Sequence, residues 1–139
     1  MRIGRDVFVG LSTRTNPAGV SQLRNYLEPF GYRIIPVAVS GCLHLKSACC
    51  PMGDGRILVN AGWLDDSALK GYDLIHVPAA EPGAANILRI GNSVLMPCGY
   101  PQTAEILQGF GLDVRAIDIS ELMKAEAAVT CSSVLFESP

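Results

Sequence analysis

The N-terminal part of the chain alternates between short apolar runs and one longer amphipathic stretch. The run Val7–Leu11 is too short for a helix and is rich in β-branched and aromatic residues, so it predicts a buried strand. Apolar residues then recur at helical spacing, and a further apolar run, Ile34–Val39, predicts a strand that returns beside the first. The positions that define the helix are Val20, Leu23, Tyr26, Leu27 and Phe30.

Both ends of this helix carry residues with distinct backbone preferences. The polar loop Ser12–Asn16 separates the strand from the helix, and Asn16 is suited to cap the first N–H groups. Pro17 fits the first turn, because the N–H that proline lacks would have no partner there. Gly31 can adopt the left-handed backbone that ends many helices. We therefore expect the helix to lie between Pro17 and Gly31.

The same order of elements recurs near the other end of the chain. Val94–Met96 predicts a strand, Pro101 opens a helix, Gly111 closes it, and Val114–Ile119 predicts the returning strand. A Phe-Gly pair stands at the end of both predicted helices. The apolar positions of the second helix are Ile106, Leu107 and Phe110. This similarity indicates an internal repeat.

The stretch between the two copies contains three more predicted strands, at Ile57–Asn60, Leu74–Val77 and Asn86–Ile90. Glycine and proline predict turns at residues 52–55 and 81–83. The expected fold class is thus α/β, built from repeated strand-strand-helix-strand units. We expect a single domain over residues 1–139.

Composition bounds the classes of function. The chain has 139 residues, of which 49% are hydrophobic and 17% charged, and its mean hydropathy is +0.29. Its net charge of −2 provides no basic surface for nucleic acid. No apolar run approaches the roughly 18 residues of a membrane span, and the segment Met1–Asp6 does not resemble a signal peptide. We expect a cytoplasmic protein.

Five cysteines, an odd number, argue against a disulfide framework and favour free thiols. Two segments far apart in the chain then suggest catalysis: Leu43–Ser47 contains His44, and Val129–Ser133 contains Cys131. A thiolate beside an imidazole is a strong nucleophile with its own acid and base. Taken alone, however, a cysteine among apolar residues is more often a buried small side chain. Small residues precede Cys131, and we expect a final strand to follow it.

Further segments accompany these two in a characteristic order: Val7–Asn16, Ala84–Asn86 and Met96–Pro101. Together the segments resemble the C-terminal part of dimethylarginine dimethylaminohydrolase, of the guanidino-group-modifying (pentein) superfamily. Enzymes of this kind are nearly twice as long, so the chain resembles half of an enzyme. Pentein proteins close five repeated units into an α/β propeller, and this stretch is expected to supply between two and three of them.

The resemblance implies roles for four residues. Cys131 is the expected nucleophile and His44 the expected general acid and base, while Arg14 is expected to hold the substrate's α-carboxylate. Backbone carbonyls near Ala125 are expected to hold the α-amino group, although the chain has Glu126-Ala127 where relatives often have Asp-Gly. The family's acidic residues that surround the guanidinium belong to the absent half.

The implied reaction is hydrolysis of an Nω-methylated L-arginine to L-citrulline and a methylamine through a thiouronium intermediate, without a cofactor. Arginine deiminases typically carry Asp two residues after the histidine, where this chain has Lys46, so a methylated substrate is favoured. An arginine deiminase or an amidinotransferase-like enzyme remains an alternative, as does an inactive truncated segment. The expected partners are the small-molecule substrate and either further copies of the chain or a complementary N-terminal chain.

A metal site is the main alternative in chemical class. Cys42, His44, Cys49 and Cys50 lie close together in the sequence. An adjacent cysteine pair followed by proline fits a tetrahedral zinc centre poorly, because zinc ligands usually occur with Cys-x-x-Cys spacing. We therefore predict no metal.

Overall fold

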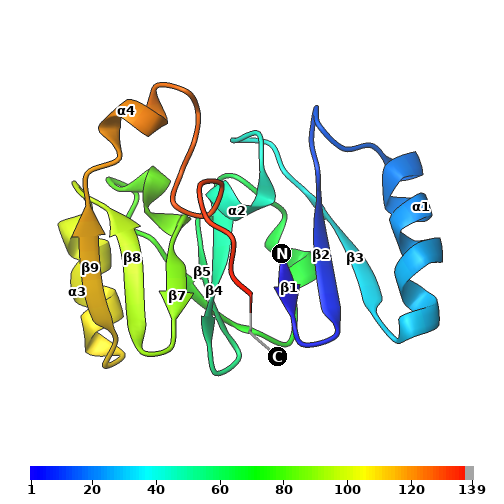
Figure 1. Cartoon of the computed structure of the whole chain (residues 1–139), viewed down its shortest axis with the longest axis horizontal. Coiled ribbons are helices and arrows are strands. Elements are labelled where there is room, and N and C mark those ends of the chain that lie inside the picture. Colours follow the sequence, from blue (N-terminus) through cyan, green and yellow to red (C-terminus); the bar gives the residue numbers. More distant parts are fainter. Residues whose placement is uncertain (137–139) are drawn as a thin grey trace.

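Three small sheets follow one another along the chain in the computed structural model, which describes residues 1–136. In each sheet the first two strands form an antiparallel pair, and the third strand lies parallel to the second. Figure 1 shows the first sheet near α1 and the third near α3, with the second between them. The strands are β1 (Arg2–Ile3), β2 (Asp6–Leu11), β3 (Arg33–Ala38), β4 (Cys49–Gly53), β5 (Arg56–Val59), β6 (Asp73–His76), β7 (Leu88–Ile90), β8 (Ser93–Pro97) and β9 (Asp113–Ile117).

A crossover joins the two parallel strands of every sheet, as parallel pairing requires. The crossovers are α1 (Pro17–Leu27), η2 (Asp66–Leu69) and α3 (Pro101–Gly109). Each is followed by a glycine with positive φ, namely Gly31, Gly71 and Gly111. The other helical segments are η1 (Glu28–Phe30), α2 (Leu45–Ala48), η3 (Pro82–Ala85) and α4 (Ser120–Met123). The chain thus contains three strand-strand-helix-strand units, which confirms the predicted fold class.

The first and third units match the sequence prediction closely. The side chain of Asn16 caps α1, with Oδ1 accepting a hydrogen bond of 2.9 Å from the N–H of Gly19. The middle unit was harder to recognise, since its crossover is a single 3₁₀ turn and β4 contains Pro51. The predicted turn at 81–83 partly overlaps η3.

The prediction of a final strand after Cys131 was wrong within the described residues. Residues 131–136 form no strand, and the hydrogen bonds of Ser132 and Ser133 reach only to the carbonyls of Ala128 and Val129. A strand needs the backbone of a neighbouring strand, and the described part of the chain pairs none with this segment. The side chains of Val134 and Phe136 are largely exposed.

The hydrophobic core lies between the units rather than inside each one. Successive side chains of a strand point to opposite faces, so β4 and β5 of the middle sheet serve two cores at once. Ile57 and Val59 face the first unit, and Leu58 faces the third. All three are fully buried, which explains the continuous apolar run of β5. The middle sheet is therefore the centre of the molecule.

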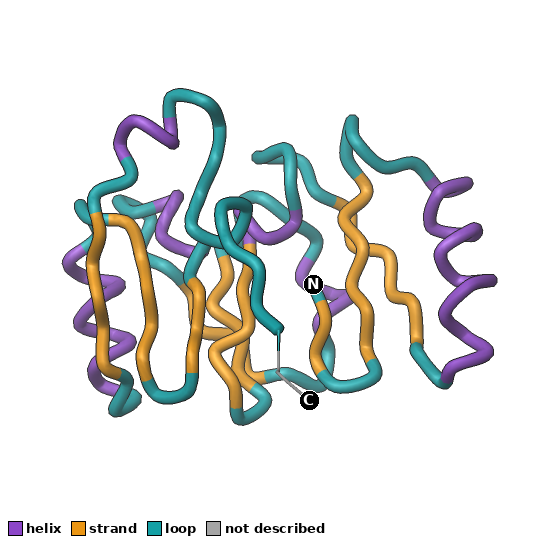
Figure 2. Tube along the Cα trace, viewed as in Figure 1, coloured by secondary structure: helices purple, strands orange, loops and turns teal. Residues whose placement is uncertain are grey.

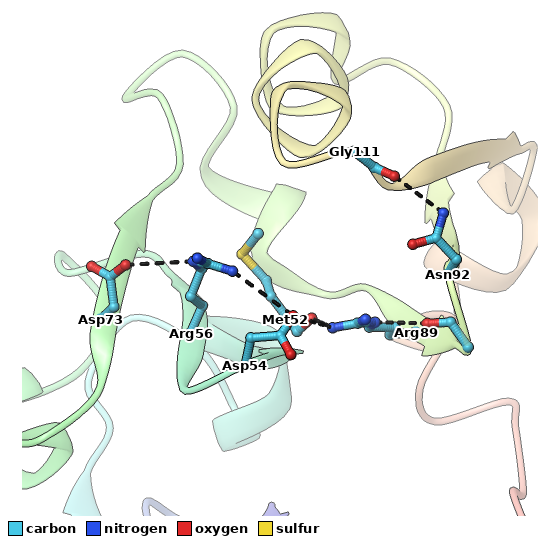
Figure 3. Close-up of polar contacts among 8 residues, drawn as sticks. Met52, Asp54, Arg56, Asp73, Arg89, Asn92 and Gly111 are labelled. Carbon is cyan, nitrogen blue, oxygen red and sulfur yellow. Dashed lines mark hydrogen bonds and ion pairs between the residues drawn. The ribbon is translucent and has the colours of Figure 1, made fainter.

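Polar contacts also join neighbouring units at the hairpin end of the sheets. Arg89, on β7, pairs with the Asp54 carboxylate at 3.6 Å and donates to the carbonyl of Met52, so it ties the third unit to the β4–β5 hairpin (Figure 3). Arg56 pairs with Asp73 at 3.6 Å within the middle unit. Long loops gather at the opposite end of the sheets (Figure 2), where a binding site is expected in parallel α/β structures.

Glu81 binds the N-terminus of α3, and we expect its carboxylate to make the stability of the fold depend on pH in the acidic range. Its buried carboxylate accepts hydrogen bonds from the N–H groups of Gln102 (2.9 Å) and Thr103 (2.8 Å) and from the Thr103 hydroxyl (2.6 Å). Burial raises the pKa of Glu81, but these hydrogen bonds outweigh burial and lower the pKa below its ordinary value of 4.5. Because the folded-state pKa is lowered, this stabilisation is present above pH 4.5 and is lost as the pH falls further.

We expect Glu81→Gln to lower the free energy of unfolding at neutral pH by about 2 kcal/mol, because an amide cannot accept all of these hydrogen bonds. Urea unfolding at neutral pH and at about pH 3 measures this effect, which should shrink in acid. The matched control is Glu105→Gln, because Glu105 is an exposed glutamate on α3, the helix whose N-terminus Glu81 binds. An equal loss in both variants, or a loss independent of pH, would contradict the prediction.

Candidate active site

Two loops leave the carboxyl ends of the parallel strands β2 and β3, and each carries a predicted site residue. The loop after β2 contains Arg14, and the loop after β3 leads to His44. Ser12 joins the two loops: its hydroxyl donates to the carbonyl of Leu43 at 2.8 Å and accepts from the N–H of Arg14 at 3.2 Å. The two loops are therefore held together by one side chain.

His44 occupies the position before α2 and has an extended backbone, with φ −127° and ψ 138°. Its carbonyl accepts hydrogen bonds from the N–H of Ser47 at 2.9 Å and from the thiol of Cys42 at 3.3 Å. The next residue, Leu45, is buried in the core and packs onto β2. A side chain at Gly10 would meet Leu45, since its Cβ would lie 2.9 Å from the Leu45 Cβ. The backbone around His44 is thus fixed, while the imidazole is exposed.

Cys131 reaches the same region by a long return of the chain. After α4 the chain crosses back from the third unit to α2 of the middle unit (Figure 1). Val129 and Thr130 are buried at the end of this crossing, and Cys131 is exposed directly after them. The two buried residues hold the segment in place and leave the thiol accessible.

A cavity of about 580 Å³ brings these residues together. Arg14, His44 and Cys131 all line it, although they come from three distant parts of the sequence. Lys46 and Ser12 also contribute to its wall, and apolar side chains of β2 form much of the remainder. No carboxylate lies among the described lining residues, and the charged side chains of the wall are cationic. A guanidinium group would need negative charge from elsewhere.

Ala125 lies outside this cavity. It is exposed, and its N–H donates to the carbonyl of Leu122 at the end of α4. Its neighbours Glu126 and Ala127 line a separate cavity of about 180 Å³ beside Trp63. Glu126, rather than Ala127, has a positive φ of 56°. The role that the resemblance implies for the backbone near Ala125 stays a prediction.

The other cysteines differ from Cys131 in environment. Cys49 and Cys50 are neighbours on β4 and point into different cores, so they cannot share one metal ion with His44. Burial raises the pKa of the Cys49 thiol to about 12 and that of the Cys50 thiol to about 11, which keeps both protonated. Within residues 1–136 no group of three or more His, Cys, Asp and Glu side chains is arranged to hold a metal.

Two polar residues that shape this region, Ser12 and Asn86, had no role predicted from the sequence. Both stand in segments that carried the resemblance, and both use their side chains to bind backbone groups of other loops. Hydrogen bonds of this kind have no periodic pattern that a sequence could reveal. Among the helices of the described chain, none is long and apolar enough to cross a membrane.

Comparison with known proteins identifies similar chains. No family model matches. The chain is 40% identical over 135 residues to the N(G),N(G)-dimethylarginine dimethylaminohydrolase of Streptomyces coelicolor, covering 96% of this chain and 51% of that protein. It is 31% identical to the protein of the same name from Pseudomonas aeruginosa, covering 98% of this chain and 54% of that one. The chain spans about half the length of the curated relatives it matches.

Solved structures agree with this similarity. A mutant of the P. aeruginosa enzyme in complex with citrulline superposes with a TM-score of 0.86 at 29% identity, covering 94% of this chain and 51% of that chain. A dimethylarginine dimethylaminohydrolase adduct with S-methyl-L-thiocitrulline gives a TM-score of 0.87 at 30% identity. The cyanobacterial arginine dihydrolase ArgZ, with a TM-score of 0.80 at 19% identity, shares the fold.

Proposed function

We propose that this chain, a homologue of one half of the dimethylarginine dimethylaminohydrolases, supplies the nucleophile and the acid/base of a hydrolase that converts Nω-methylated L-arginine to L-citrulline. The observation that carries the proposal is the cavity into which three distant segments bring Cys131, His44 and Arg14. A thiol, an imidazole and a guanidinium around one space suit attack on an amino-acid substrate that carries a carboxylate.

The proposed reaction has two steps. The Cys131 thiolate attacks the guanidinium carbon and forms a C–S bond. The bond from this carbon to the methylated nitrogen then breaks, and the His44 imidazolium gives its proton to the departing amine. This leaves a thiouronium on Cys131. Water, which loses a proton to the now neutral His44, attacks the same carbon, and cleavage of the C–S bond releases citrulline and the thiolate.

Two cationic side chains of the cavity wall have different proposed roles. The planar guanidinium of Arg14 is suited to hold the substrate's α-carboxylate with two hydrogen bonds. Lys46 stands where a deiminase would carry a carboxylate for unsubstituted guanidinium nitrogens, and this favours a methylated substrate. The proposal is therefore a dimethylargininase rather than an arginine deiminase.

The cavity wall lacks the negative charge that a guanidinium substrate needs, and we propose that a further polypeptide segment supplies it. This segment is either a second copy of the chain or the half that the relatives contain and this chain does not match. We also propose a cytoplasmic location, because all five cysteines are free, as is usual for thiols in a reducing compartment.

Citrulline release tests the proposal. The chain, at an oligomeric state measured by light scattering, is incubated with asymmetric dimethylarginine, with monomethylarginine and with arginine. We expect release from the methylated substrates and little from arginine. Faster release from arginine would identify a deiminase, and no release by folded protein would show that the chain is not an enzyme by itself. The first result contradicts the proposed substrate, and the second excludes a further copy of the chain as the source of the missing negative charge.

A further inference from the structure

The side chain of Asn86 connects the two segments that carry the proposed catalytic pair. Asn86 lies between η3 and β7 and is 3% exposed. Its Nδ2 group donates to the carbonyl of Lys46 at 2.8 Å and to the hydroxyl of Thr130 at 2.9 Å. Its Oδ1 accepts from the N–H of Thr130 at 3.2 Å. One amide thus binds the turn that follows His44 and the residue that precedes Cys131.

This connection has no substitute among the described hydrogen bonds. Backbone hydrogen bonds within residues 125–136 link this segment to itself or to the end of α4, as in Ser132 to Ala128 and Ala127 to Leu122. The hydroxyl of Ser133 also binds locally, to Val129. In the part of the chain that the structure describes, every hydrogen bond from residues 125–136 to a more distant segment is made by Asn86.

The surroundings of Asn86 fix its amide in turn. Ala84 and Ala85 precede it and are fully buried, so η3 packs closely on α2. Ile87 follows it and enters the core beneath β4. The polar atoms of Asn86 are all paired, as a buried amide requires. A buried amide with complete hydrogen bonds and rigid neighbours holds its partners in one arrangement.

We propose that Asn86 is a positioning residue that sets the placement of Cys131 relative to His44. The inference rests on the proposed function, because it assumes that these two side chains act together. Asn86 does not line the cavity that contains them, and it acts through Thr130 and Lys46. Small displacements of a reacting group lower reaction rates by large factors. Loss of the hydrogen bonds of Asn86 should therefore remove the effect of His44 on the reactivity of Cys131.

Alkylation of individual cysteines by iodoacetamide, followed by peptide mass spectrometry, tests the inference on the chain itself. The decisive quantity is the dependence of the Cys131 rate on His44. We expect His44→Ala to slow alkylation of Cys131 about tenfold in the otherwise unchanged chain. In an Asn86→Ala background, adding His44→Ala should change the rate by less than about twofold, because the two side chains are then uncoupled.

The chain provides internal controls for this double-mutant cycle. Cys98 is exposed and reports general thiol reactivity, while buried Cys49 and Cys50 become reactive only if the variant unfolds. Asn60→Ala is the matched variant, since the Asn60 amide also joins two distant segments, with Nδ2 donating to the carbonyl of Pro82 in η3 at 2.9 Å. In Asn60→Ala, the rate of Cys131 alkylation should depend on His44 as strongly as in the unchanged chain.

A second pair of variants covers the case in which Asn86→Ala fails to fold. Thr130→Ser keeps the hydroxyl that Asn86 binds and should preserve the dependence on His44, whereas Thr130→Val removes this hydroxyl and should weaken the dependence. If the tenfold dependence persists in folded Asn86→Ala or in Thr130→Val, the inference about Asn86 is overturned. If His44→Ala has no effect in the otherwise unchanged chain, the proposed catalytic pair itself is overturned.

Discussion

Replacement of Cys131 by serine is expected to abolish turnover of methylated arginine, with a loss of more than about four orders of magnitude. The reaction needs a thiolate that forms a C–S bond, and a serine hydroxyl, whose pKa is far higher than that of a thiol, is a much weaker nucleophile at neutral pH. Cys131 is exposed in the cavity, so an electrophile that resembles a guanidinium, such as chloroacetamidine, should label this thiol faster than that of exposed Cys98, and Cys131→Ser should lose this fast labelling.

Cys98→Ser is the matched control for this prediction. Cys98 is also exposed, but it lies at the end of β8 in a different cavity, away from His44. Its replacement should change neither turnover nor labelling of Cys131. Measurable turnover in Cys131→Ser, or labelling that requires Cys98 instead, would exclude the thiouronium mechanism on this chain.

Replacement of His44 by alanine is expected to lower kcat by about 10²–10⁴-fold, the usual contribution of a positioned general acid and base. Both proposed steps need a proton transfer at this imidazole, first to the departing amine and then from water. Cys131 remains in place, so slow covalent labelling should persist. The variant should therefore separate labelling from turnover, which rapid-quench kinetics with a methylated substrate can measure.

His76→Ala is the control for the histidine prediction. His76 is the other histidine of the chain, is exposed on β6, and does not line the cavity. Its replacement should leave kcat unchanged. Turnover that survives in His44→Ala at the level of the His76→Ala control would remove His44 from the mechanism and require another proton donor.

Local features of the fold were predictable because their causes are local. The helix after Pro17 follows from apolar spacing, and its ends follow from the capping amide of Asn16 and the left-handed backbone of Gly31. In the middle unit the sequence predicted β5 and β6 but not β4 or the crossover, because Pro51 and a single turn of 3₁₀ helix obscure their patterns. The strand predicted after Cys131 was wrong, since an apolar run forms a strand only beside another backbone.

The candidate site likewise combines features that the sequence predicts with features that only the tertiary structure reveals. Sequence resemblance selected Cys131, His44 and Arg14 as site residues, and the structure places all three around one cavity, whereas Ala125 lies elsewhere. The sequence by itself thus determined two of the three repeated units, the boundaries of α1 and α3, and the chemical groups available. The tertiary structure alone decided which thiols are buried, because alternate residues of the middle sheet enter different cores. It also decided that one buried amide joins the two proposed catalytic segments, since such a contact depends on where the returning chain crosses α2 and not on any local pattern.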